Sequence, residues 1–193
     1  MTTYEKDGSS YPRVSHILDV VDWGIRKCPP YILKKLGRKG TSFHNNIHKK
    51  VIGEPTRVPV EAKDKVDEMM EYLKQYKILF TEQHVYWDDP VNPERKYAGT
   101  LDLLLEDKQG RIILADIKTG KIYKRGIVQA SAYKEAAEQF LKVKIDSRLI
   151  IKPCKDYIGN TSIQEYGEGG MDSHEKCWRM FNNMLSLYQD MHR

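Results

Sequence analysis

Residues 99–118 read GTLDLLLEDKQGRIILADIK, and this stretch decides the fold. Two runs rich in leucine and isoleucine, over 100–106 and 111–118, predict strands. Residues 107–110 between them have turn composition, so the two strands are expected to form a hairpin. Asp102 and Asp116 lie symmetrically about Gln109, the centre of the turn. We therefore expect their carboxylates to face each other across the hairpin, with Lys118 on the same face as Asp116 because side chains alternate along a strand.

Two facing carboxylates repel each other, and in strands of this composition they are expected to be largely buried. A buried pair of anions is costly unless a cation neutralises it. Lys118 is one candidate cation. A divalent metal ion is the other, since Mg²⁺ prefers carboxylate oxygens with positions left for water and phosphate. A purely structural salt bridge between Asp116 and Lys118 is the alternative interpretation.

Outside the hairpin, helical and extended patterns alternate, which is typical of an α/β fold. Strands are predicted over 78–87, 147–152 and, more weakly, 162–166. The expected helices span 15–21 with Ser15 as cap, Pro29-Pro30 to about Lys50 with Gly37 and Gly40 as a break or close-packing point, 61–76, 127–140, and a final segment begun by a capping box of Asp172 and Glu175. We predict a single domain over 1–193, mainly helical over 1–76, with a sheet core and a C-terminal helix over 77–193. Its central mixed sheet has about four to five strands flanked by helices.

The composition is that of a soluble globular protein: 193 residues, 40% of them hydrophobic, with a formal net charge of +5. The first residues are polar and no apolar run is long enough to span a membrane, so we expect a cytoplasmic protein without a membrane partner. The three cysteines (Cys28, Cys154 and Cys177) make neither a closed disulfide set nor a closely spaced metal site. We therefore expect the protein to be located in a reducing compartment.

The positive charge is concentrated in one segment. Residues 23–53 hold eight of the 32 basic residues and no acid, which leaves 24 bases against 27 acids elsewhere. The eight are Arg26, Lys27, Lys34, Lys35, Arg38, Lys39, Lys49 and Lys50. A concentrated basic surface suits a polyanion, since each neutralised phosphate releases counterions. A solvated helix face that is rich in lysine is the alternative.

Several short motifs occur in one order: GTSFH at 40–44, Glu82, GTLD at 99–102, DIKTG at 116–120 and QASAY at 129–133. In this order they resemble the PD-(D/E)XK nuclease superfamily. The similarity is closest to its RecB-like branch with the mitochondrial genome-maintenance exonucleases, and to a stand-alone member of the kind that phages encode. Leu101 stands where proline is common in this branch. The cysteine set of the iron–sulfur members is missing, so no cluster is expected.

The resemblance implies a role for each matching residue. Mg²⁺ or Mn²⁺ would be bound by His44, Asp102, Asp116 and the Ile117 carbonyl, and Glu82 would hold a second metal or support the site. The catalytic set would be Asp102, Asp116, Lys118, Gln129 and Tyr133. Lys118 would orient or help deprotonate the attacking water. Gln129 and Tyr133 would brace Lys118 or contact the DNA backbone. DNA would be bound by Lys34, Lys35, Arg38, Lys39, Lys121, Lys124 and Arg125.

We therefore expect a metal-dependent DNA nuclease that hydrolyses phosphodiester bonds, acting as an exonuclease in DNA recombination, repair or replication. Its partner would be DNA, single-stranded or at duplex ends, and a recombination or replication protein is a further candidate. If a phage encodes the protein, its location would be the host cytoplasm. A structure-specific endonuclease for flaps or junctions is one alternative. A catalytically silent nucleic-acid-binding module and an α/β protein whose Asp–Lys cluster is only a salt bridge are two others.

Overall fold

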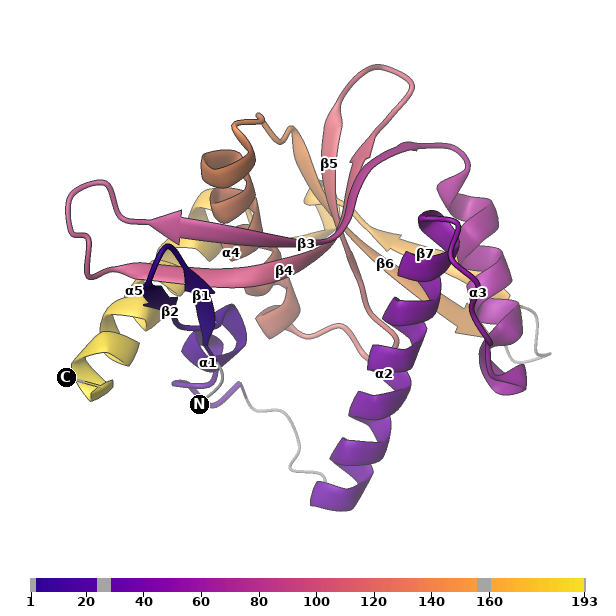
Figure 1. Ribbon diagram of the computed structural model, residues 1–193, viewed down its shortest axis with the longest axis horizontal. Coiled ribbons are helices and arrows are strands. Elements are labelled where there is room, and N and C mark those ends of the chain that lie inside the picture. The colour runs from indigo at the N-terminus through magenta and orange to yellow at the C-terminus, as the bar shows by residue number, and fades with distance from the viewer. Residues whose placement is uncertain (1–2, 24–28, 156–160, 193) are drawn as a thin grey trace.

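A five-stranded mixed sheet forms the centre of the protein (Figure 1), whose computed structural model describes residues 3–23, 29–155 and 161–192. The strands are β3 (Lys77–Asp88), β4 (Lys96–Glu106), β5 (Ile112–Ile117), β6 (Ser147–Lys155) and β7 (Thr161–Tyr166), in the spatial order β3-β4-β5-β6-β7. β5 and β6 are parallel and every other neighbouring pair is antiparallel. The helix α4 (Lys124–Leu141) connects the parallel pair, as a parallel crossover requires. The prediction of an α/β fold with a mixed sheet is confirmed.

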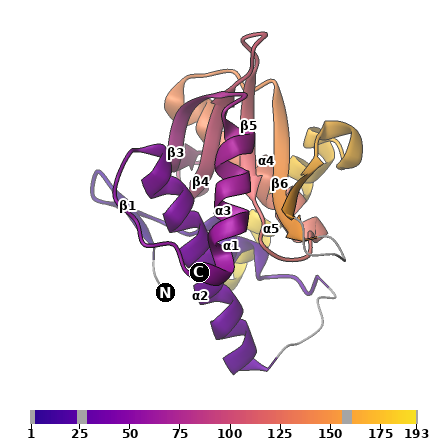
Figure 2. The ribbon, with the colours of Figure 1, turned by 90° about the vertical axis from the view of Figure 1, so that its right-hand side faces the viewer.

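Helices cover both faces of the sheet (Figures 1 and 2). On one face, α2 (Pro30–Val51) and α3 (Val60–Leu73) bury Phe43, Ile47 and Met69 against Leu103 and Leu105 of β4. On the other face, α1 (Val14–Leu18), α4 and α5 (His174–His192) enclose a second core. The central strands β4, β5 and β6 therefore have apolar runs because both of their faces are buried, whereas the edge strands β3 and β7 keep exposed residues. No helix in the described ranges combines the length and the apolar character that a membrane span needs.

Four details differ from the sequence-based prediction. The helix α1 begins at Val14, with Ser15 inside it and no side-chain cap, because Arg13 takes the extended position before the helix. The helix α2 runs unbroken through Gly37 and Gly40, so neither is a break, and of the two only Gly40 has a neighbour near the position of a Cβ, Thr119 Oγ1 at 3.5 Å. The predicted cap Asp172 binds Lys124 and Lys176 as ion pairs, and the Ser173 hydroxyl instead accepts a hydrogen bond from the Lys176 backbone N–H at 3.3 Å. A short hairpin of β1 (Tyr4–Lys6) and β2 (Ser9–Tyr11) was not predicted at all.

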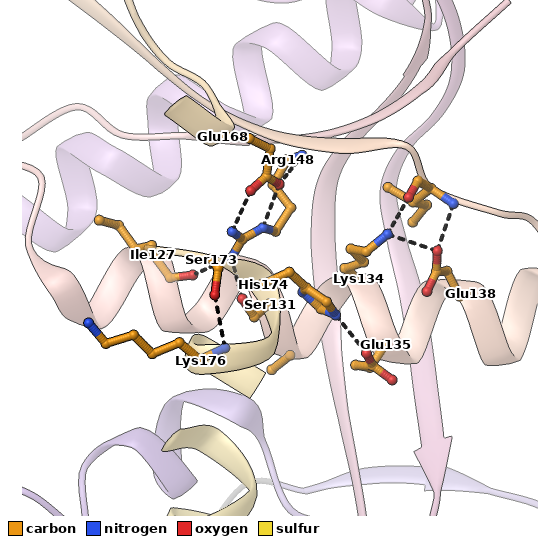
Figure 3. Close-up of polar contacts among 12 residues, drawn as sticks. Ile127, Ser131, Lys134, Glu135, Glu138, Arg148, Glu168, Ser173, His174 and Lys176 are labelled. Atoms are coloured by element: carbon orange, nitrogen blue, oxygen red, sulfur yellow. Dashed lines mark hydrogen bonds and ion pairs between the residues drawn. The ribbon is translucent and has the colours of Figure 1, made fainter. Parts of the chain in front are cut away.

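A buried arginine holds α4 in place behind the sheet (Figure 3). Arg148 of β6 is 1% exposed, and it forms an ion pair with Glu168 of the 3₁₀ helix η1 (Glu168–Gly170) with an Nη2–Oε2 distance of 2.7 Å. Its guanidinium also donates to the Ser131 hydroxyl of α4 and, at 2.9 Å, to the Asp172 carbonyl. A buried charge is tolerated when its donors are satisfied in this way. The network therefore fixes the helix that carries Gln129 and Tyr133.

Candidate metal centre

The strands β4 and β5 separate where the chemistry-bearing residues lie. Their paired residues end at Leu103 and Ala115, and beyond that point β4 continues to pair with β3 but no longer with β5. The same register, continued by one residue, sets Asp102 opposite Asp116, as the symmetry about Gln109 predicts. This point of separation, beyond Leu103 and Ala115, is called the fork below. There, Asp102 Oδ2 accepts a hydrogen bond from the Ile117 backbone N–H at 2.7 Å. The Asp102 carboxylate thus takes the place of the backbone hydrogen bonds between β4 and β5 at the point where these strands separate.

Three side chains from three elements converge on this fork. His44 Nδ1 of α2 lies 3.1 Å from Asp102 Oδ1 and 3.8 Å from Glu82 Oε1 of β3. One ligand atom of each of the three residues lies within 4.8 Å of the others. His44 is held over the sheet because Phe43 and Ile47 of the same helix are buried against it. The structure therefore brings these three predicted site residues together, and their role as metal ligands stays a prediction.

Glu82 has an unusual backbone for a strand residue. Its φ is +50°, whereas its strand neighbours Thr81 and Gln83 pair normally with Leu103 and Leu101. A residue with a side chain rarely adopts this left-handed region, at a cost of order 1–3 kcal/mol, and such residues concentrate at functional sites. The strand residue with the distorted backbone is thus the one whose carboxylate lies beside His44 and Asp102.

A second chain of contacts runs from Asp116 to α4. Lys118 Nζ lies 2.6 Å from Asp116 Oδ2 and donates to Gln129 Oε1 at 3.1 Å. Gln129 Nε2 in turn donates to the Tyr133 hydroxyl at 2.9 Å. Gln129 and Tyr133 lie one turn apart on the helix, so both reach the same side. The structure therefore joins the two helix residues to the lysine, and their part in catalysis stays a prediction.

The pKa values of these groups reflect burial and mutual repulsion. Burial, together with the nearby Asp102, raises the pKa of Asp116 to about 6 against the opposing effect of Lys118. Burial and Asp102 also raise the pKa of Glu82. For Asp102, burial acts upward, but His44, Lys118 and the Ile117 N–H outweigh it and lower the pKa.

The two cations of the cluster are stabilised in their charged forms. Burial alone would lower the pKa of His44, but the charge and hydrogen bond of Asp102, together with the charges of Asp116 and Glu82, outweigh burial and raise it. Burial would likewise lower the pKa of Lys118, and Asp116 and Asp102 reverse the direction. Lys118 is thus an ammonium donor at neutral pH, because its ordinary pKa is already above 10.

The donor set of His44, Glu82 and Asp102 suits a divalent ion. One imidazole nitrogen and two carboxylates are ligands for Mn²⁺, and the carboxylates suit Mg²⁺. Asp116 was predicted as a further ligand, but it is not in the compact group of three and instead contacts Lys118. The Ile117 backbone N–H contacts Asp102. An ion in this group would be held by the three residues, with Asp116 one strand away.

The predicted DNA-binding residues fall into two kinds of environment. Lys34, Lys35, Arg38 and Lys39 are exposed on the first turns of α2, which extend beyond the body of the protein in Figure 1. By contrast, Lys124 forms an ion pair with Asp172 at 2.6 Å, and Arg125 forms one with Asp19 at 2.8 Å. Lys121 Nζ lies 5.4 Å from the centre of the Tyr123 ring. The basic residues Arg26 and Lys27 lie outside the described ranges.

Two hollows flank α2 and the fork. A groove of about 450 Å³ beside α2 is lined by Arg38, Thr41, Ser42, Asn45, Asn46, Lys49, Thr56 and Arg57. A cleft of about 260 Å³ opens on Glu82 and Asp102, and its other walls include Tyr4, Arg13 and Thr100. Tyr4, Arg13 and Arg57 were not predicted as site residues from the sequence, and Thr100 was named only as part of the GTLD motif. The Asp7-Gly8 pair is a hairpin signal that could have predicted the hairpin of β1 and β2, which carries Tyr4.

No protein-family model matches the chain, and no curated protein matches it. Among solved structures, "Crystal structure of SSO0001" is similar, with a TM-score of 0.44 and 14% sequence identity, over 95% of this chain and 78% of that chain.

Proposed function

We propose that the chain is a metal-dependent nuclease of the PD-(D/E)XK type that hydrolyses DNA phosphodiester bonds, acting as an exonuclease. The observation that carries this proposal is the adjacency of two units at one fork. One is the His44–Glu82–Asp102 group, and the other is the Asp116–Lys118 pair braced by Gln129. A simple structural salt bridge accounts for the second unit but not for a histidine and two further acids beside it.

Each residue has a chemical task under this proposal. His44, Glu82 and Asp102 would hold Mg²⁺ or Mn²⁺, which supplies a Lewis acid for a phosphate oxygen and for the attacking water. Hydrolysis adds water across the P–O bond: the water oxygen joins phosphorus and a hydrogen goes to the leaving oxygen. Lys118 carries a proton, so it suits orienting that water and stabilising the negative charge that grows on the phosphate, rather than acting as the base.

The surroundings also support a nucleic-acid substrate. The groove beside α2 contains three cations, Arg38, Lys49 and Arg57, and no acid among its lining residues. Arg38, Asn45 and Lys49 lie along one side of the helix that presents His44 to the fork, since their spacings of seven and four residues keep one face. Phosphate contacts from this face would position a strand without reading its sequence.

The test is hydrolysis of end-labelled single- and double-stranded DNA with Mg²⁺, Mn²⁺ or EDTA, beside Asp102→Asn and Lys118→Met. We expect metal-dependent degradation of linear DNA that both substitutions abolish, and no cutting of closed circular DNA. Cutting of circles or of flap and junction substrates would favour the endonuclease alternative. DNA binding without hydrolysis under every metal condition would refute the nuclease and favour the binding module. Surface variant Arg179→Gln serves as the control.

A further inference from the structure

The cleft that opens on Glu82 and Asp102 also contains a cation, Arg13, to which none of the roles above is assigned. Arg13 lies between β2 and α1, and its backbone forms an isolated parallel bridge with Ala98 of β4. It lines the same cleft of about 260 Å³ as Glu82 and Asp102, together with Tyr4, Ser15 and Thr100. A guanidinium and two metal-ligand-type carboxylates therefore share one polar hollow.

Tyr4 holds the guanidinium in one place. Arg13 Nη2 donates to the Tyr4 hydroxyl at 3.2 Å, and the guanidinium carbon lies 5.0 Å from the centre of the Tyr4 ring. The Tyr4 hydroxyl is itself 2.8 Å from the Thr100 hydroxyl of β4, which also contacts His84 Nδ1 at 2.9 Å. The chain Arg13–Tyr4–Thr100 thus anchors the cation to the strand that carries Asp102. A preorganised guanidinium loses little freedom when it binds an anion.

We infer that Arg13 is a phosphate-binding residue for the nucleic-acid strand, which engages a phosphate next to the one at the metal group. Planar guanidinium groups bind phosphate with two parallel hydrogen bonds. A phosphate bound by Arg13 would occupy the same cleft as Asp102 and Glu82, because all three residues line it. This inference rests on the proposed nuclease function.

The phosphate could be a terminal monoester or an internal diester, and binding assays separate the two. Fluorescence anisotropy in EDTA, where metal-dependent hydrolysis cannot occur, is measured with single-stranded oligonucleotides bearing a 5′-phosphate, a 3′-phosphate or hydroxyl ends. We expect Arg13→Gln to weaken binding about tenfold, the value of a charge-assisted hydrogen bond. The dependence of log K on log salt should flatten by about 0.7, which corresponds to one phosphate contact on a single strand.

The losses of affinity on the three oligonucleotides identify which phosphate Arg13 binds. A wild-type preference for one phosphorylated end that Arg13→Gln removes supports a terminal phosphate. An equal loss on all three oligonucleotides supports an internal phosphate. The control Arg179→Gln removes the same charge from α5 and should bind as the wild type does. Equal affinity and salt dependence for Arg13→Gln and Arg179→Gln would overturn the inference.

Two further variants separate binding from folding. Arg13→Lys keeps the charge but not the planar fork, so we expect it to restore the salt dependence while leaving affinity below that of the wild type. If Arg13→Gln fails to fold, Tyr4→Phe leaves the guanidinium and removes only the hydroxyl that holds it. We expect about a threefold loss from Tyr4→Phe, and no loss would refute the inference. A wild type that binds no DNA in EDTA and hydrolyses none with Mg²⁺ or Mn²⁺ would refute the proposed function itself, whereas a wild type that binds while Arg13→Gln binds equally refutes only the role of Arg13.

Discussion

Replacing Asp116 by asparagine should stabilise the protein without metal while abolishing its proposed activity. The Asp116 side chain is 3% exposed, and even with Lys118 Nζ at 2.6 Å its pKa is raised to about 6 by burial and by Asp102. The carboxylate is thus less stable in the folded protein than in the unfolded chain, where its pKa is near 3.8. The gap corresponds to about 3 kcal/mol, at about 1.4 kcal/mol for each pH unit.

The sign of the effect follows from proton linkage. Between an unfolded pKa near 3.8 and a folded pKa of about 6, the folded protein keeps a proton that the unfolded chain has released. The contribution of Asp116 to wild-type stability therefore falls as pH rises through this window and is constant above it. The amide that Asp116→Asn introduces has no proton to release. The free energy of unfolding of Asp116→Asn relative to wild type should rise from near zero below pH 4 to about 3 kcal/mol at pH 8.

The assay is urea denaturation in EDTA at several pH values, with Asp107→Asn as a matched control. For Asp107, burial acts to raise the pKa, but hydrogen bonds from Arg111 and Gln109 lower it. That carboxylate stabilises the fold above its unfolded pKa and loses its effect as pH falls, so Asp107→Asn should destabilise at pH 8. If Asp116→Asn proves less stable than wild type at pH 8, the ion pair with Lys118 outweighs burial and our reasoning is wrong.

Three other substitutions test separate parts of the structure. His44→Ala should lower metal-dependent hydrolysis by more than about tenfold, whereas His48→Ala should change it little; equal losses would remove His44 from the ligand set. Gly99→Ala would bring a Cβ within 2.4 Å of Tyr133 Cε1, so we expect a loss of about 1–3 kcal/mol in urea denaturation, and an unchanged midpoint would contradict the packing. Arg148→Met should cost about 1–3 kcal/mol because it removes the buried hydrogen bonds to Ser131 and the Asp172 carbonyl as well as the pair with Glu168, which is itself 36% exposed, and calorimetry showing wild-type stability would argue against that network.

The sequence was sufficient to predict the hairpin of β4 and β5, because the residues that determine this hairpin lie close together in the chain. Apolar runs, a turn and two acids at equal distances from Gln109 determine the register without any knowledge of the rest of the chain. The strand and helix positions followed from the same kind of short-range pattern, with errors mainly at their ends. The placement of His44 beside Asp102 came from resemblance to known nucleases, since no local rule brings a helix residue to a strand 58 positions later.

The contacts that sequence analysis missed depend on tertiary structure. The strands β1 and β2 have three residues each, which is too short for an alternating pattern to be recognised, so the cleft wall formed by Tyr4 and Arg13 was not foreseen. Arg148 looks like a surface cation in a strand, and only the packing of α4 and η1 makes it 1% exposed. The left-handed backbone of Glu82 has no sequence signal, because glutamate rarely adopts it.

The helix α2 links the two charge environments of the protein. Its His44 faces an acidic fork, and its neighbouring side presents Arg38 and Lys49 to a basic groove. The net charge of +5 conceals this arrangement, because the acids that reduce it include Asp102 and Asp116 at the fork. A polyanion attracted to the basic side would be repelled by the fork unless cations offset the carboxylates there. Lys118 and His44 supply part of that compensation, and a divalent ion would supply the rest, so metal binding and strand binding at this fork should strengthen each other.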